Sequence, residues 1–200
     1  MLAALELCYI CFESIITSLD NSRIAPLYKF FSRKADSTDK YPLFVTWKKS
    51  NQLRGCIGTF QPNPLYMGLR KYSRSAAFHD ERFPPITKEE IPQLTCTVNL
   101  LHSFEDTVNA FDWQIGKHGI ILTIKNVFQA TFLPEVMVEN RWSKEETIKQ
   151  LALKAGYNGV IDDELLQSCK VRRYQSSSIT ASYDQYLEYY NEFNAKNSEL

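Results

Sequence analysis

The sequence predicts an α+β protein built on an antiparallel β-sheet core flanked by helices, arranged as one body or as two lobes. Three observations lead to this fold class: helical periodicity of apolar residues at both ends, alternating β-rich segments between them, and short connections. The 200 residues are 44% hydrophobic and 23% charged, which is enough to bury a substantial core. We therefore expect a single domain over residues 1–200, with the tail at 183–200 at its periphery.

The first predicted element is a helix, because apolar residues recur every three or four positions: Leu5, Cys8, Phe12, Ile15, Ile16 and Leu19. Cys8 and Cys11 form an isolated C-x-x-C pair on this apolar face, where packing residues belong. No second pair follows at zinc-finger spacing, so we expect no metal. The polar residues 32–40 then predict a surface loop.

A β-hairpin is predicted next, from the β-rich segments 43–47 (LFVTW) and 53–60 (LRGCIGTF) and the turn composition of residues 48–52. Asn63 as N-cap and Pro64 as first helical residue predict a helix after it. The apolar face of this helix would hold Leu65, Leu69, Tyr72 and Ala76. Its basic face is interpreted as solvated charge rather than a phosphate or RNA site.

The rest of the chain alternates between strand and helix signals. The sequence at 87–90 has capping-box form and predicts a short helical turn, and the alternation after it predicts a strand at 94–100 with Cys96 facing inward. Apolar and β-rich runs predict strands at 120–124, 127–133 and 169–174, with a turn at 125–126 and a break at 176–178. Helices are predicted from the capping box at 143–146 to Gly156, and again over 183–193.

Cys56 is the most informative candidate residue, because it lies in a predicted strand beside Gly55 and close to Gly58. An interior strand glycine marks a bulge or a place where another backbone or a ligand comes close, so the pair suggests a shaped pocket. Arg54 would share a face with Cys56, and a nearby guanidinium favours a reactive thiolate. The alternative is that Cys56 is a small buried hydrophobe.

The segment 78–85 (FHDERFPP) concentrates polar chemistry in one short stretch before two prolines. His79, Asp80, Arg82 and Phe83 are candidates for a functional loop, since such loops often carry function. The structural alternative is an Asp80–Arg82 ion pair that fixes the loop, with Phe83 inserted into the core.

His118 is the third candidate, because it lies between Gly116 and Gly119 just before a predicted strand. Its side chain would reach into a cleft, or the segment is only a turn that tolerates histidine.

Charge and cysteine content argue against some classes of protein. With 23 basic and 23 acidic residues and no long basic run, general nucleic-acid binding is unsupported. Glu6 and Glu13 interrupt the apolar start and no cationic region precedes it, which argues against a signal peptide or a membrane span. Five scattered cysteines indicate reduced thiols, so we expect a protein that stays inside the cell.

Several ordered motifs together resemble the AMMECR-domain family, named after the Alport syndrome, midface hypoplasia, mental retardation and elliptocytosis chromosomal region. The resemblance covers nearly the whole chain. It is carried by residues 53–60, 77–85, 116–119, 130–136 and 154–156, by Trp142, and by 8–12, which is similar to the start of eukaryotic members.

This resemblance implies a compact α+β domain in the cytoplasm or the nucleus, with an activity that is unsettled across the family. It names no cofactor. The family motif maps onto residues already selected above: Arg54, Gly55, Cys56, Gly58, Asp80, Arg82, Phe83 and His118.

Two functions follow as hypotheses. The preferred one is a binding or adaptor module, in which a cleft around residues 53–58 holds a protein segment or a small molecule. The alternative is an enzyme with Cys56 as nucleophile, His79 or His118 as base, and Arg54 or Arg82 holding an anionic group of the substrate, with Asp80 orienting its neighbours.

Overall fold

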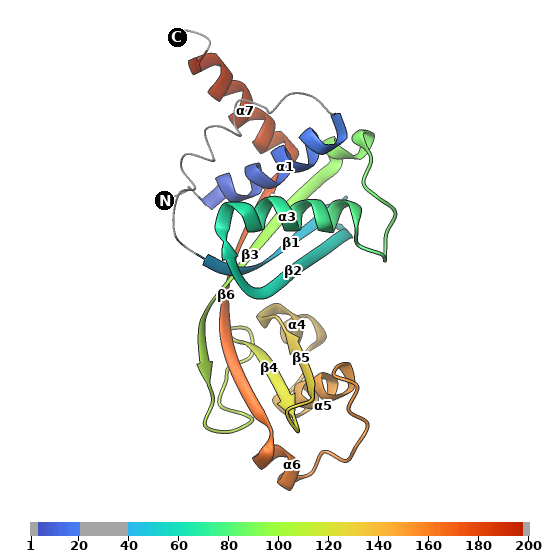
Figure 1. Ribbon diagram of the computed structural model, residues 1–200, viewed down its shortest axis with the longest axis vertical. Coiled ribbons are helices and arrows are strands. Elements are labelled where there is room, and N and C mark those ends of the chain that lie inside the picture. Colours follow the sequence, from blue (N-terminus) through green and yellow to red (C-terminus); the bar gives the residue numbers. More distant parts are fainter. Residues whose placement is uncertain (1–3, 21–39, 198–200) are drawn as a thin grey trace. The chain divides into compact units, whose positions relative to one another are not determined.

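The computed structural model describes residues 4–20 and 40–197, and it divides into two compact units (Figure 1). Unit 1 runs to Leu100 and resumes at Ser178, and unit 2 is Leu101–Ser177. The strands follow the order β2-β1-β3-β6-β4-β5, in which β3 (Leu94–Asp106) and β6 (Lys170–Ser182) contribute to both units. The predicted α+β fold is confirmed.

Unit 1 contains a hairpin, with helices packed on one face of its sheet. Its remaining elements are α1 (Ala4–Asp20), β1 (Lys40–Lys49), β2 (Gln52–Pro64), α3 (Leu65–Phe78), the 3-10 helix η1 (Lys88–Gln93) and α7 (Tyr183–Asn197). β1 pairs antiparallel with both β2 and β3. Helix α3 packs on the hairpin, and α1 lies beside α3 (Figure 1).

Side-chain alternation in β1 decides which face of this sheet the helices cover. Leu43, Val45 and Trp47 are completely buried, and the Trp47 indole donates a hydrogen bond to the Ser73 carbonyl of α3 at 2.9 Å. The intervening side chains are half-buried or exposed. An antiparallel sheet with one covered face shows this pattern. Cys96 is also completely buried, opposite Trp47, as predicted.

Unit 2 packs three short helices with the β4–β5 hairpin. Its elements, beside β3 and β6, are β4 (Gly119–Ile124), β5 (Phe128–Phe132), α4 (Pro134–Asn140), α5 (Lys144–Lys154) and α6 (Asp163–Ser168). Helix α5 packs on β4 and β5, and their core includes Ile120, Leu122 and Leu151, all fully buried. Ser143 caps α5 by accepting a hydrogen bond from the Glu146 amide, as the sequence predicted.

Both predicted hairpins are confirmed, and so are their turns. Ser50 and Asn51 join β1 to β2 with positive φ angles, and Lys125 and Asn126 do the same between β4 and β5. Two successive positive φ angles match the right-handed twist of the flanking strands. The helix predicted at 183–193 is α7, and one of its side chains, Tyr186, belongs to the core of unit 1.

Some sequence predictions are wrong. Asn63 does not cap α3: it belongs to β2, and Pro64 is the N-cap residue, because β2 pairs with β1 as far as Lys40–Pro64. The break predicted at 176–178 is absent, since β6 continues through it and Ser177 hydrogen-bonds His102 at 2.9 Å.

Two helices were not predicted at all, and one predicted loop is not described. α4 and α6 span seven and six residues, and Leu133 and Asp162 are their N-caps. The loop predicted at 32–40 lies outside the described residues except for Lys40, which opens β1.

Cys8 and Cys11 are packing residues. Both are completely buried in the core of unit 1, and the Cys11 thiol donates to the Leu69 carbonyl at 3.9 Å. Within residues 4–20 and 40–197, no group of three His, Cys, Asp or Glu side chains is arranged to hold a metal ion. Over the same residues, no helix has the length and apolar content needed to cross a membrane.

Candidate functional site

Cys56 lies on β2, which is an edge strand, and its side chain is half-buried on the face that α3 does not cover. The register pairs it with Thr46 and pairs Gly55 with Trp47, which faces the helices. Because successive strand residues alternate in direction, Arg54 and Cys56 share the opposite face, as predicted.

The glycines beside Cys56 allow close packing on both sides of the strand. A Cβ on Gly55 would lie 2.0 Å from the Ala76 carbonyl oxygen of α3, so the helix backbone rests directly on β2 at this point. A Cβ on Gly58 would lie 2.4 Å from the Phe44 ring on the other face. A neighbouring backbone and an aromatic ring therefore account for the two glycines.

Asp80 and Arg82 bind both backbone groups of Cys56. The Cys56 amide donates to Asp80 Oδ2 at 2.8 Å, and Arg82 Nη2 donates to the Cys56 carbonyl at 3.2 Å. Asp80 and Arg82 also form a bidentate pair, with distances of 2.9 Å from Nε to Oδ1 and 2.7 Å from Nη2 to Oδ2. The loop after α3 thus satisfies the free edge of β2 at Cys56, which an unpaired edge strand requires.

Asp80 is a buried carboxylate that remains charged. Its side chain is only 6% exposed, whereas that of Arg82 is 56% exposed. Hydrogen bonds from the Arg82 guanidinium, together with the backbone amides of Cys56 and Arg82, hold the pKa of Asp80 well below its usual range despite the burial. The ion-pair alternative for this loop is therefore what the structure shows.

The Cys56 sulfur contacts a hydroxyl group. Thr46 Oγ1 donates to Sγ at 3.2 Å across the β1–β2 pair. The Cys56 amide and carbonyl point away from β1, toward Asp80 and Arg82, so this is a non-hydrogen-bonded pair, the kind in which side chains come closest. Thr46 was not predicted as a site residue, and the strand alternation that placed Arg54 could also have placed it.

Arg54 is engaged with the loop and η1. Its Nε and Nη2 donate to the Glu90 carboxylate at 3.0 and 2.9 Å, and its Nη1 and Nη2 donate to the carbonyls of Pro84 and Pro85 at 2.6 and 3.2 Å. Lys49 also donates to Glu90, at 3.0 Å. The guanidinium predicted to act on the thiol instead ties β2 to residues 84–90.

Glu90 is a second residue that the sequence did not mark as part of the site. Hydrogen bonds from Arg54, the Thr87 amide and Lys49 lower its pKa to about 2. Thr87 and Glu90 form the capping box predicted at 87–90, so the signal for Glu90 was present but pointed only to a helix start.

His79 and Phe83 flank the Asp80–Arg82 pair. His79 is exposed at the end of α3, where its amide donates to the Ser75 carbonyl. Phe83 is half-buried outside the core cluster, and the Arg82 guanidinium lies 5.5 Å from its ring centre. The alternative that Phe83 is inserted into the core is therefore wrong.

His118 belongs to unit 2, whereas the other candidates belong to unit 1. It is 7% exposed, and its Nδ1 accepts a hydrogen bond from the Gln114 amide at 3.0 Å. Burial, together with the charges of Arg173 and Lys117, lowers its pKa, which favours the neutral ring. Gly116 has φ +79 in the same turn, so the structure shows His118 bonded within its own turn.

The chain is similar to uncharacterised proteins of plants, fungi and archaea. It is 39% identical over 194 residues to one from Arabidopsis thaliana. The aligned region covers 92% of this chain and 87% of that protein. It is 38% identical over 189 residues to one from Schizosaccharomyces pombe, covering 91% and 94%. The crystal structure of an uncharacterised protein from Pyrococcus horikoshii matches with a TM-score of 0.70 and 26% identity, over 88% of this chain and 89% of that one.

A family model, AMMECR1, matches residues 8–179. This range includes Cys56, Asp80, Arg82 and His118, and it agrees with the resemblance seen in the separate motifs. The chain belongs to the AMMECR1 family.

Proposed function

We propose that this protein is a binding module that uses the face of the unit 1 sheet opposite α3 to hold a protein partner. A polar row crosses that face over four strands: Cys56 pairs with Thr46, Thr46 pairs with Thr97, and the Thr97 and Thr180 hydroxyls lie 2.9 Å apart. Thr46, Cys56 and Thr97 are half-buried and Thr180 is exposed. We call these four residues the polar row.

The observation that carries this proposal is the use of the charged residues around Cys56. Asp80 and Arg82 bind the backbone of Cys56, and Arg54 binds Glu90 and two carbonyls. These groups hold an edge strand in place. A binding surface needs such supporting contacts, because they keep its side chains in one geometry. Among the described residues, the sulfur's side-chain hydrogen bond is with a threonine hydroxyl, which is not a general base at neutral pH.

The first experiment asks whether binding depends on the strand or on the thiol. Proteins retained from a cell extract by the immobilised full-length chain would be identified, and one would be purified and its affinity for each variant measured by calorimetry. Arg82→Ala should weaken binding by about tenfold, because it frees the Cys56 carbonyl at the strand edge. Cys56→Ala should keep the affinity within about twofold, since the strand edge and the hydroxyls of Thr46, Thr97 and Thr180 stay in place.

The matched control is Arg74→Ala, which removes an exposed arginine from α3. It should leave the affinity unchanged. Loss of binding in Cys56→Ala, with Arg82→Ala unaffected, would reject this form of the proposal.

The enzyme alternative predicts a different reactivity of Cys56. If Cys56 is an activated nucleophile, iodoacetamide should alkylate it at neutral pH much faster than it alkylates glutathione, a free thiol of ordinary reactivity. The binding module predicts a rate at or below that of glutathione, because Cys56 is half-buried. Peptide mass spectrometry assigns the rate to Cys56 and separates it from the other four cysteines.

A further inference from the structure

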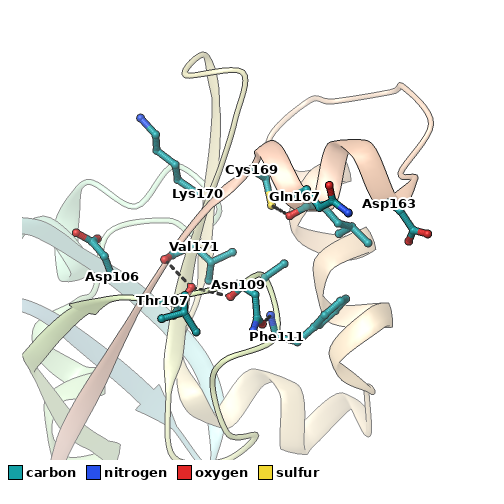
Figure 2. A pocket seen from close by; sticks show the side chains of 12 residues that line it. Asp106, Thr107, Asn109, Phe111, Asp163, Gln167, Cys169, Lys170 and Val171 are labelled. Atoms are coloured by element: carbon teal, nitrogen blue, oxygen red, sulfur yellow. Dashed lines mark hydrogen bonds between the residues drawn. The ribbon is translucent and has the colours of Figure 1, made fainter.

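Unit 2 contains a cavity of about 700 Å³ that is separate from the Cys56 site. It lies between residues 106–111, which are the end of β3 and the segment after it, and the junction of α6 with β6 (Figure 2). Ligand pockets have volumes of roughly 300–1,000 Å³, so its size suits a small molecule.

The inner lining of this cavity is apolar. Ala110 and Val171 are buried, Phe111 and Leu166 are half-buried, and all four belong to the core of unit 2 or pack against it. Contact with these side chains would remove apolar surface of a ligand from water, which favours binding.

Hydrogen bonds hold one wall of the cavity in shape. The Thr107 hydroxyl donates to the carbonyls of Asn109 and Val171, at 2.8 and 3.0 Å, and the Thr107 amide donates to Val171 at 3.1 Å. Asn109 Oδ1 accepts from the Phe111 amide at 2.8 Å. This wall is therefore fixed before any ligand arrives, and a preformed site loses less entropy on binding.

The opposite wall is held in the same way. Asp162 caps α6 by accepting from the Leu165 amide at 2.9 Å. The Cys169 amide donates to the Leu165 carbonyl at 2.8 Å, and the Cys169 thiol donates to the Leu166 carbonyl at 3.3 Å.

The charged residues of the lining do not favour a charged ligand. Lys170 donates to Asn126 Oδ1 at 3.0 Å, and Asp106 lies 3.7 Å from Arg172. The third charged residue of the lining, Asp163, is exposed. Figure 2 shows the side chains of Lys170, Asp106 and Asp163 turned away from Thr107 and Asn109. A ligand charge buried here would lack a counter-charge at close range, and an unpaired buried charge is costly.

Two neutral amides line the cavity on its two walls, Asn109 and Gln167. Within the described part of the chain, the Asn109 amide nitrogen and both polar atoms of the Gln167 side chain make no hydrogen bond. Both can donate to a carbonyl oxygen.

We propose that this cavity binds an uncharged, mostly apolar small molecule that carries a carbonyl group. The apolar floor accepts its body, and the Asn109 and Gln167 amides bind its oxygen. This site does not depend on the proposed function of unit 1, and no residue is shared between the two.

Prodan, an uncharged naphthyl ketone whose emission shifts to the blue in apolar surroundings, is a suitable probe. Titration of the full chain should give a saturable blue shift. Leu166→Glu places a charge on the cavity wall and should weaken prodan binding by at least about tenfold. Leu153→Glu changes an exposed leucine of α5, 58% exposed, in the same unit and should have no effect.

A second measurement uses the unaltered protein, so it does not depend on the folding of a variant. Cys169 lines the cavity and Cys56 does not. At a prodan concentration about ten times its Kd, about one site in eleven is empty, so alkylation of Cys169 should slow about tenfold. The rate at Cys56 should be unchanged.

Three results would overturn the proposal: no saturable shift, equal affinity for the wild type and a folded Leu166→Glu, or bound prodan that leaves Cys169 unprotected. The binding-module proposal would survive each of them, because its variants lie in unit 1.

Discussion

Asp80 determines how Cys56 is presented, although the two residues are 24 positions apart. Its carboxylate accepts from the Cys56 amide and from the Arg82 guanidinium while its side chain is 6% exposed. Hydrogen bonds to a charged group are stronger than those between neutral groups, so the charge of Asp80 contributes more to stability than its shape. Asp80→Asn keeps the shape and removes the charge.

We predict that Asp80→Asn lowers the free energy of unfolding by about 2 kcal/mol at neutral pH. The folded-state pKa of Asp80 is depressed, so the unfolded chain binds more protons as the pH falls. The stabilisation is therefore complete above the unfolded value of about 3.9 and is lost progressively below it. Urea unfolding of both proteins between about pH 7 and about pH 3 should show the difference shrinking in acid.

Glu81→Gln is the matched control, since Glu81 is the exposed neighbour of Asp80. Its unfolding free energy at neutral pH should match that of the wild type. A wild-type advantage over Asp80→Asn that stays constant down to about pH 3 would contradict the assignment.

At the level of single residues, the sequence predicts on which face of a strand a side chain lies better than it predicts which groups that side chain binds. Alternation correctly placed Arg54 and Cys56 on one face. It did not reveal that Arg54 binds Glu90, 36 residues away, while Arg82 reaches the Cys56 carbonyl. Several arginines and carboxylates satisfy the same local pattern, and only the folded chain decides which of them meet.

At the level of elements, Gly55 decides how closely α3 can approach β2. A Cβ there would lie 2.0 Å from the Ala76 carbonyl oxygen, which is backbone and cannot rotate away. We predict that Gly55→Ala destabilises the protein by about 3 kcal/mol, because the helix must move off the strand. Thermal or urea unfolding measures the change.

Gly156→Ala separates this steric effect from the general cost of replacing a glycine. Gly156 has φ +83, and a Cβ added there would meet no other atom within 4 Å. Alanine therefore costs only backbone strain at this position, about 1 kcal/mol. Equal destabilisation by the two substitutions would contradict the close-packing role of Gly55.

The elements that were predicted correctly are those with a repeated signal. The two hairpins have β-rich or apolar runs on both sides of a turn, and α1 has an apolar repeat over several turns. α4 and α6 were missed because helices of seven and six residues are too short to establish a 3.6-residue period. The serines at 176–178 were misread as a break, because cross-strand hydrogen bonds outweigh their low strand preference.

At the level of the whole molecule, the sequence left open whether the chain forms one body or two lobes, and it did not place the boundary between the two units. β3 and β6 each continue without interruption from one unit into the other, at Leu100–Leu101 and Ser177–Ser178. Alternation along a strand shows which residues face a core. It does not show where the strand passes from the core of one unit to the core of the other.

The reactivity of the five cysteines reports on burial in both units in one measurement. All are free thiols, and Cys8, Cys11 and Cys96 are 0% exposed, whereas Cys56 in unit 1 and Cys169 in unit 2 are half-buried. Burial also raises the pKa of Cys11 and Cys96, so these thiols stay protonated and unreactive near neutral pH.

We therefore predict that the native, reduced protein reacts with the aromatic disulfide DTNB at two thiols, and that all five react in concentrated urea. Cys169 should react slowly, because burial raises its pKa. Cys56→Ala and Cys169→Ala should each remove one reactive thiol, whereas Cys96→Ala should remove none. Because Cys8 and Cys11 of α1 lie in one core with Cys96 of β3, a third native thiol reacting at a comparable rate would mean that this core opens without unfolding.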